Sequence, residues 1–159
     1  MEIGRLLEYD FWATEQILAQ VAALTNEQFL HEFAGPFSSV RQQAAHLVTV
    51  PDRYRARIMG EAVPDVAPET FKAPSDVIDH FQTVVAKMRE MLACLSGSRL
   101  SEVIRHDTRA GLFVLTVEQT LMHVVNHGTF HRGQLAMLLK LHEMEPINTD
   151  LILWPRLQG

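Results

Sequence analysis

Hydrophobic positions recur along most of the chain at spacings of three, four and seven residues, the pattern of helices that bury one face. The pattern predicts four main helices, which cover about residues 2–23, 39–60, 75–96 and 116–143. Ser39 and Thr116 are each followed three residues later by glutamine, the form of a capping box, which marks the start of the second and fourth helices. A similar capping box at Thr25 predicts a short helical turn after the first helix.

The segments between these helices carry their own signals. Pro51 lies inside the second helix, and because proline clashes with the preceding turn we expect a kink near residue 47. Residues 61–74 include several prolines and are expected to form an ordered crossing loop. Apolar and β-branched residues flank a turn with Gly111, which predicts a short β-hairpin packed against the bundle. The apolar tail, residues 150–155, should also pack back on the bundle.

Length and composition fit one folded domain. The chain has 159 residues, of which 47% are hydrophobic and 21% charged, so we predict a single all-α domain over residues 1–159. The formal net charge of −5 argues against nucleic-acid binding, which needs a basic face to replace phosphate counterions. The nearest basic stretch, Arg53, Arg55 and Arg57, is interpreted as a solvated helix face.

Three further observations bear on the setting of the protein. The N-terminus lacks a basic region followed by an apolar block, so we do not expect a secretion signal. No apolar run approaches the roughly 20 residues that a membrane span needs, so no membrane partner is expected. Cys94 is the only cysteine, which excludes an intrachain disulfide, and it is interpreted as a small buried residue. We therefore expect a cytoplasmic protein.

The fourth helix carries three histidines at four-residue intervals, His123, His127 and His131. Side chains at i and i+4 share a face, with Cβ atoms about 5–6 Å apart, so His127 and His131 can bind one metal ion. This spacing alone is a weak signal. His46 lies among apolar residues of the second helix and is the candidate third ligand, although a hydrogen-bonded core histidine is the alternative. His123 is rotated away from the pair; we interpret it as a supporting residue, and it stays an alternative ligand.

Other residues of the fourth helix are candidates for supporting roles. Gly128 and Gly133 each cost about 1 kcal/mol relative to alanine inside a helix, so we expect either a closely approaching helix or open space beside them. Asn126 and Gln134 are candidates to orient a ligand imidazole. Arg132 is a candidate to contact a substrate anion or a dimer partner, and an ion pair is the simpler interpretation. The remaining histidines are interpreted as surface groups: His31, His80, His106 and His142.

The segment HVVNHGTFHRGQL, residues 123–135, resembles the signature of the DinB/YfiT-like family of metal-dependent enzymes. LLEYDFWATEQIL and AAHLVTVPDRYRARIMGE resemble the first and second helices of that family, so the resemblance covers nearly the whole chain. It implies a four-helix bundle with up-down-down-up connectivity, in which the second and third helices run parallel. It also implies a homodimer, and one divalent transition metal ion, zinc or nickel, held by His46, His127 and His131. Thr14 departs from the family, in which asparagine is expected.

Three histidine ligands leave a coordination position open, an arrangement typical of catalytic sites. Water or a thiol can be activated at such a position. We predict a metal-dependent transferase or hydrolase that acts on a small molecule, and the resemblance favours a low-molecular-weight thiol. Two alternatives stay open, a non-catalytic metal-binding stress-response protein and a metal-free helical interaction module. The sequence identifies no general acid or base.

Overall fold

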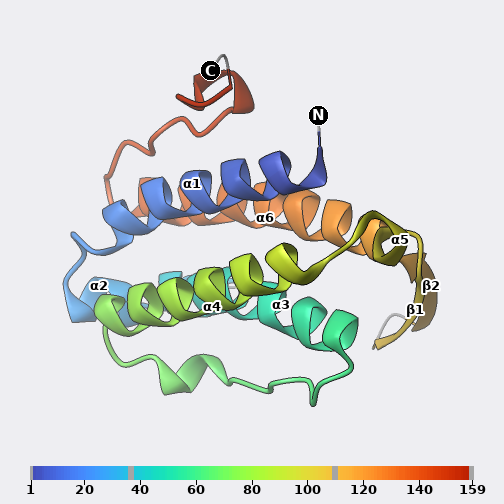
Figure 1. The fold of residues 1–159 in the computed structure, drawn as a ribbon. Helices are drawn as coiled ribbons and strands as arrows, with labels where there is room; N and C mark the ends of the chain where they lie inside the picture. The colour runs from blue at the N-terminus through green and yellow to red at the C-terminus, as the bar shows by residue number, and fades with distance from the viewer. Residues whose placement is uncertain (1, 36–37, 109–110, 158–159) are drawn as a thin grey trace.

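The computed structural model, which describes residues 2–35, 38–108 and 111–157, is a bundle of four long helices (Figure 1). These helices are α1, Ile3–Val21; α3, Val40–Met59; α4, Pro74–Cys94; and α6, Val117–Leu141. They confirm the four predicted helices to within two residues at either end. The described chain also contains short helical segments, namely α2, Asn26–Leu30; η1, Pro68–Thr70; α5, Gly97–Leu100; and η2, Leu151–Leu153.

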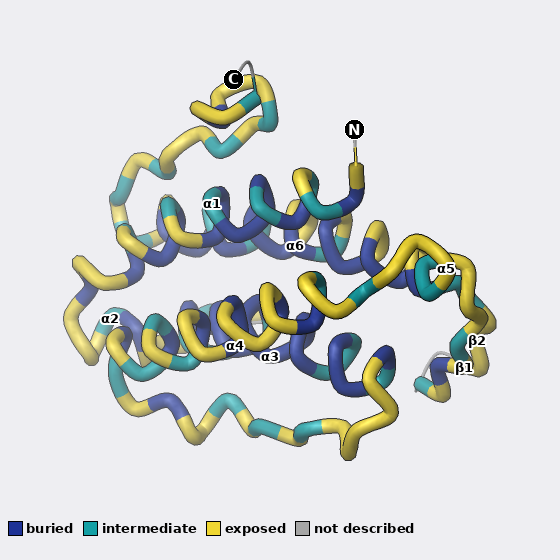
Figure 2. The backbone as a smooth tube through the Cα atoms, viewed as in Figure 1, coloured by how far each residue is buried: buried dark blue, intermediate teal, exposed yellow. Residues whose placement is uncertain are grey.

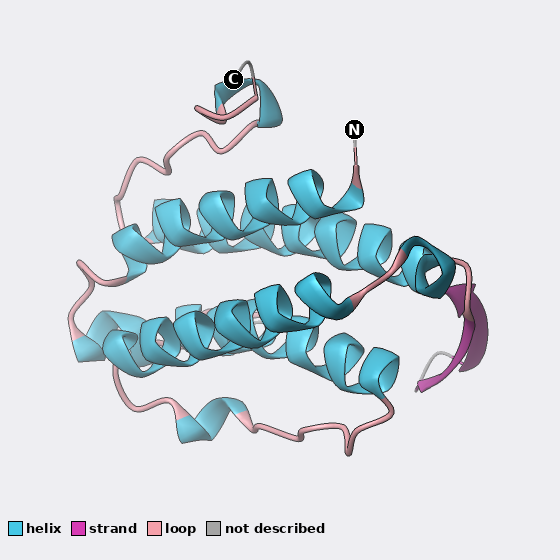
Figure 3. Ribbon diagram, in the orientation of Figure 1, coloured by secondary structure: helices cyan, strands magenta, loops and turns pink. Residues whose placement is uncertain are grey.

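The connectivity is up-down-down-up, as expected. In Figures 1 and 3, α1 and α6 run in one direction and α3 and α4 in the opposite one. A long loop, residues 60–73, returns the chain from the end of α3 to the start of α4. Within the bundle, α3 packs against both α4 and α6, and α6 packs against α1. Because α3 and α6 pack directly against each other, side chains on their facing sides can meet.

Side-chain caps fix where the helices begin. The Thr116 hydroxyl accepts a hydrogen bond from the backbone N–H of Gln119, whose side chain accepts one from the N–H of Thr116. At α3 only half of the expected box is formed: the Ser39 hydroxyl accepts from the backbone N–H of Gln42, but the Gln42 side chain accepts from the N–H of Ser38 instead of Ser39. The third expected box, at Thr25, begins α2. The α3 helix continues through Pro51 to Met59, and the kink near residue 47 stays a prediction.

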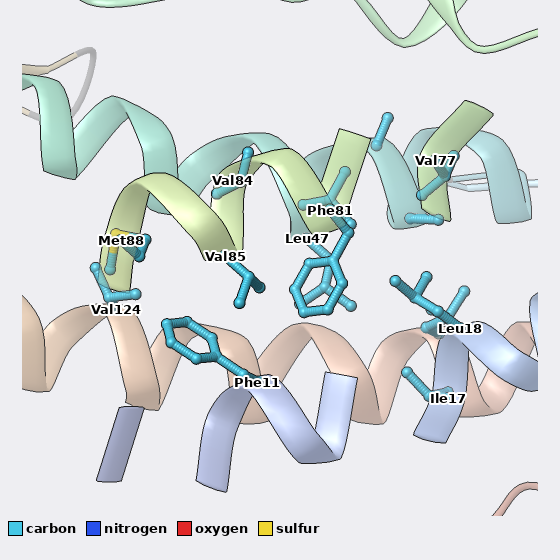
Figure 4. Packing of buried hydrophobic residues seen from close by; sticks show 14 of the residues in the cluster. Phe11, Ile17, Leu18, Leu47, Val77, Phe81, Val84, Val85, Met88 and Val124 are labelled. Atoms are coloured by element: carbon cyan, nitrogen blue, oxygen red, sulfur yellow. The ribbon is translucent and has the colours of Figure 1, made fainter. Parts of the chain in front are cut away.

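The hydrophobic core lies between the four helices, where the buried residues face one another in Figure 2. Figure 4 shows how side chains from different helices meet there: Phe11 of α1, Leu47 of α3 and Phe81 of α4. Met88 of α4 and Val124 of α6 extend the core toward the other end of the bundle. In the described part of the chain, no helix combines the length and the hydropathy that crossing a membrane requires.

The predicted hairpin is confirmed. Strands β1, Val103–Thr108, and β2, Gly111–Thr116, pair in antiparallel register at the end of the bundle where α3 ends and α6 begins (Figure 1). The sequence turn at residues 109–110 lies outside the described residues. His106 of β1 was expected at the surface, but its side chain is only 1% exposed because the strand turns it inward, where Nε2 lies 2.9 Å from the Thr120 hydroxyl.

The C-terminal tail packs back on the bundle as predicted. Trp154 is buried against Tyr9 and Ala13 of α1, and the Tyr9 hydroxyl donates to the carbonyl oxygen of Thr149 at 2.9 Å. The interpretation of Cys94 as a buried residue is wrong, because it is exposed at the end of α4. It follows the core residue Met88 by six positions, about 240° around the helix, and so lies off the buried face.

Candidate metal centre

Three histidines from two helices meet at one place. His46 of α3 and His127 and His131 of α6 each offer a ring nitrogen, and these atoms all lie within 4.8 Å of one another. The ring centroids of His127 and His131 are 4.1 Å apart, and that of His46 lies 4.4 Å from His131 and 5.0 Å from His127. The structure therefore brings together the three residues singled out by the sequence, in a group that could hold a metal ion.

The local helix geometry and the packing of the bundle have separate parts in this arrangement. The spacing of four residues puts His127 and His131 on one face of α6. His46 reaches them because α3 packs directly against α6. His131 is buried at 5% exposure, whereas His46 and His127 are half-buried. The His131 side of the three-histidine group is thus buried in the bundle, and the side formed by His46 and His127 is partly exposed to solvent.

The protonation of these imidazoles suits metal ligation. Burial, assisted by the neighbouring imidazoles, lowers the pKa of His127 to about 3. Burial, with the charges of His131 and Arg53, lowers the pKa of His46 to about 4. Both rings are therefore neutral at pH 7 and carry a lone pair. Nε2 of His127 is buried and has no hydrogen-bond partner among the described residues, a costly arrangement that a metal ion would relieve. The residues present fit a metal ion.

A residue that the sequence did not single out orients His131. Gln43 is fully buried, and its Nε2 lies 2.9 Å from Nδ1 of His131, 2.9 Å from the carbonyl oxygen of His131 and 3.1 Å from Oε1 of Gln134. Burial lowers the pKa of His131, and a hydrogen bond to Gln134 opposes this. Gln134 thus lies beside the triad as expected. The signal for Gln43 was its place three residues before His46, a polar residue on the same helix face.

Two more of the predicted supporting residues, His123 and Asn126, differ in position. His123 is exposed, and its Nε2 lies 3.0 Å from the Tyr54 hydroxyl. Its ring centroid is 5.6 Å from that of His127, so it borders the triad without joining it. Asn126 lies on the exposed face of α6, together with Met122 and Phe130, and is directed away from the bundle core.

Arg132 forms a buried ion pair with Asp10 of α1, the simpler of the two interpretations of this residue. The Arg132 side chain is 3% exposed; its Nη1 donates to the Asp10 carboxylate and, at 3.2 Å, to the Thr14 hydroxyl. Burial raises the pKa of Asp10 to about 6, and the Arg132 charge opposes this rise. Thr14, which stands where the family pattern has asparagine, accepts a hydrogen bond from the same Arg132 and so lies beside the ion pair. Arg132 ties α6 to α1 and is not available to a substrate.

The two mid-helix glycines have different environments. A Cβ at Gly128 would overlap the Asp10 carboxylate and lie 2.9 Å from Arg132 Nη1, so the close approach of α1 accounts for this glycine. A Cβ at Gly133 would meet no atom of the described residues within 4 Å. Nothing in the structure explains Gly133.

The open side of the triad faces a cleft between α3, α6 and the hairpin. His46, Tyr54 and His127 line a hollow of about 660 Å³, together with Arg53 and Arg57 of α3. A second hollow of about 510 Å³ shares these two histidines and Tyr54, and is bounded by the hairpin and α6 through His106, Phe113, Leu115 and His123. A small molecule entering the cleft can therefore contact two of the three histidines.

Comparison with known proteins agrees with this architecture. The model of the DinB family matches residues 1–158. Protein DinB of Bacillus subtilis (strain 168) is 25% identical over 143 residues, which cover 86% of this chain and 83% of that protein. A crystal structure of a DinB-like protein from Bacillus cereus covers 92% of this chain and 94% of its own, with a TM-score of 0.75 and 19% identity. A conserved protein from Enterococcus faecalis covers 87% and 94%, with a TM-score of 0.65 and 18% identity. The two solved structures show the shared fold.

Proposed function

Because the chain belongs to the DinB family, we propose that it holds one divalent transition metal ion between His46, His127 and His131 and acts as a metal-dependent transferase or hydrolase on a small molecule. One observation carries the proposal: the three imidazoles converge, and two of them, His46 and His127, line an open cleft. Histidines that serve only to pack the core would not be expected to line a cleft.

Zinc and nickel are the ions that we favour, in line with the family resemblance; neutral imidazole nitrogen suits both, as it also suits copper and iron. When bound, such an ion offers an open coordination position at which the pKa of a coordinated water or thiol falls toward neutrality. We favour a low-molecular-weight thiol as the co-substrate, in line with the family resemblance. The apolar side chains Phe113 and Leu115 along the second hollow suit the carbon skeleton of a small ligand.

The chain's own polar residues have distinct tasks under this proposal. Gln43 and Gln134 hold the His131 ring in place from the buried side. Burial raises the pKa of Tyr54, so its hydroxyl stays protonated at neutral pH and can donate a hydrogen bond. The hydroxyl lies 3.0 Å from Nε2 of His123, at the wall of the cleft. A ligand in the second hollow would therefore meet a neutral donor, and the described residues that line this hollow include no carboxylate; Asp65 and Asp107 line the first hollow.

The metal part of the proposal is tested by measuring the metal content of untagged protein, purified without chelators, by mass spectrometry. We expect near-stoichiometric metal in the wild type, and its loss in His46→Ala and His127→Ala. His31→Ala and His142→Ala are matched controls, since these two rings lie 5.9 Å from each other in a separate cluster with Phe33. Equal metal content in all four variants would contradict the assignment. So would a wild type that stays empty when zinc or nickel is offered.

The catalytic part needs a separate test, because a purely structural ion would give the same metal content. Cobalt-substituted protein is titrated with a small thiol, and the visible absorption of the cobalt is followed. An open position predicts a new sulfur-to-cobalt band with saturable dependence on the thiol. An unchanged spectrum would favour the non-catalytic alternative, in which the ion only ties α3 to α6.

We also propose that the chain forms a homodimer through the outer face of α6. Four large apolar side chains on this helix are more than half exposed: Met122 at 55%, Phe130 at 62%, Met137 at 63% and Leu141 at 57%. Exposed apolar side chains that follow one helix face are typical of a surface that packs against a partner.

A further inference from the structure

Three arginines at alternate positions of α3 separate into two environments. Arg55 is buried and forms ion pairs with Asp52 at 2.5 Å and with Glu61 at 2.7 Å. Arg53 and Arg57, one turn apart, instead line the 660 Å³ cleft that His46 and His127 also line. The carboxylates of Asp65 and Asp107 line the same cleft, so its charged side chains are two arginines and two aspartates among the described residues. The sequence interpretation of this stretch as a solvated face therefore does not hold for Arg55, and it overlooks the cleft for the other two.

We propose that Arg53 and Arg57 bind the anionic group, a carboxylate or a phosphate, of a small molecule whose other end reaches the three-histidine site. The anion site stands on the two arginines and the cleft alone. Only the assignment of the bound molecule as a substrate rests on the proposed function. The site would select acidic small molecules from among the many that could enter an open cleft.

The hydrogen-bonding state of Arg53 supports this assignment. Its Nη2 donates to the Asp65 carboxylate at 2.7 Å, while its Nε is buried and has no partner among the described residues. A guanidinium offers a planar fork of donors that matches a carboxylate or a phosphate. The Asp65 side chain is 94% exposed, so the pair is weak and an entering anion can replace it. Asp65 thus marks the position that a ligand anion would take.

Arg57 supplies the second positive charge. Its guanidinium carbon lies over the Tyr54 ring, 5.5 Å from the centroid, which keeps the guanidinium at the wall of the cleft. Besides burial, which is the main cause, the Arg57 charge lowers the pKa of His106, which lines the adjoining hollow. An anion placed between the two guanidinium groups would therefore gain from both.

The α3 helix also sets the length of the ligand. Arg53 follows His46 by seven residues, two helical turns, or about 10 Å along the axis. Val50 and Tyr54 line the cleft along this stretch. The ligand that fits has an acidic group at one end, an apolar middle and its reacting group several ångströms away, within the rise of about 10 Å between these two backbone positions. A six-carbon chain with one acidic end is a suitable probe.

The experiment titrates the full-length protein, as purified and after chelator treatment, with hexanoate, hexyl phosphate and the neutral hexan-1-ol. Binding is followed by NMR at the arginine Nε–H groups, and the chelator-treated sample excludes direct binding of the probe to a metal. We expect one or both anions to shift the Arg53 and Arg57 signals and to bind at least tenfold more tightly than hexan-1-ol. The order of hexanoate and hexyl phosphate then identifies the carboxylate or the phosphate as the preferred group.

Variants make the assignment specific. Arg53→Met and Arg57→Met should each weaken anion binding about tenfold or more, with thermal unfolding measured to confirm the fold. Arg105→Met removes an exposed arginine of β1 that does not line the cleft, and should leave binding unchanged. Asp65→Asn should tighten binding, because it removes the carboxylate that pairs with Arg53 and leaves Asp107 as the remaining described carboxylate of the cleft. A purely structural Arg53–Asp65 pair would not produce this effect.

Equal anion affinity in the wild type, Arg53→Met and Arg57→Met would overturn the anion site, as would an equal loss in Arg105→Met. The proposed function can fail separately. Protein that never takes up metal, yet binds hexyl phosphate through the two arginines, contradicts the metal site and leaves the anion site standing. Metal-loaded protein that gives no anion-dependent shift contradicts the anion site alone.

Discussion

Gly128 and Gly133 of α6 allow a prediction in which the same substitution has opposite effects five residues apart. In Gly128→Ala, the new Cβ would overlap the Asp10 carboxylate and press on Arg132 Nη1 at 2.9 Å. Asp10 is 4% exposed and paired with Arg132, so it has little room to move without leaving its partner. In Gly133→Ala, the new methyl group meets no atom of the described residues within 4 Å. Only the first change disturbs the contact between α1 and α6.

The magnitudes follow from these surroundings. Separating one partner from a buried ion pair costs about 3–5 kcal/mol. Alanine recovers about 1 kcal/mol of helix propensity, so Gly128→Ala should lower the free energy of unfolding by about 2–4 kcal/mol. Gly133→Ala has only the favourable contribution and should raise it by about 0.5–1 kcal/mol. In a domain of this size, the loss in Gly128→Ala corresponds to a Tm lower by about 4–16 °C.

The assay is urea unfolding of the chelator-treated proteins, followed by circular dichroism, with thermal unfolding as a second measure. Chelator treatment matters because Gly128 adjoins His127, and a change in metal binding would otherwise contribute to the measured stability. A Gly128→Ala variant as stable as the wild type would refute the close packing of α1 on α6. A Gly133→Ala variant destabilised as much as Gly128→Ala would show that both glycines respond to some other constraint.

Three further predictions concern the site and the surface. Because the folded-state pKa values of His46 and His127 are about 4 and about 3, against an ordinary value of 6.5, the unfolded chain binds protons first as the pH falls. The metal-free protein should therefore lose stability as the pH falls from 6.5 toward 4, and His46→Ala should flatten this dependence in urea unfolding. Phe130→Glu and Met137→Glu should give monomers in sedimentation analysis of a protein that is otherwise dimeric; a monomeric wild type would contradict the α6 interface. Exposed Cys94 should react with a thiol reagent in the folded, metal-loaded protein without releasing metal, whereas reaction only on unfolding would contradict its position.

The features predicted from the sequence are those encoded within a few residues. The Thr116 cap depends on an amide group three residues away, and the spacing of His127 and His131 depends only on helix geometry. Helix geometry alone could not assign His46 to the site, because it lies on a different helix from His127 and His131. Its apolar neighbours suggested that it points inward, and the family resemblance indicated that it joins the other two histidines. The single-domain organisation, the cytoplasmic location and the metal itself stay predictions.

The features that were missed depend on contacts between distant parts of the chain. Asp10 and Arg132 are 122 residues apart, and neither position shows from its neighbours that the other will lie against it. Gln43 likewise meets His131 only because α3 packs on α6. Gly128 was predicted to lie beside either a closely approaching helix or open space, and the sequence could not tell which of the two. In each case the missing information is which helix faces which.

The arginines of α3 show that the sequence could have predicted part of this information, namely which side of α3 faces the histidines of α6. Successive residues of a helix are rotated by about 100°, so Arg53 and Arg57 each lie within about 20° of the direction of His46, while Arg55 lies about 180° from it. Once His46 is placed in a metal site, the same helix geometry puts two of the three arginines on the side of that site and the third against the remaining helices. The positive charges near the triad thus follow from the spacing of 46, 53 and 57, and an acidic small molecule is the substrate class to screen first.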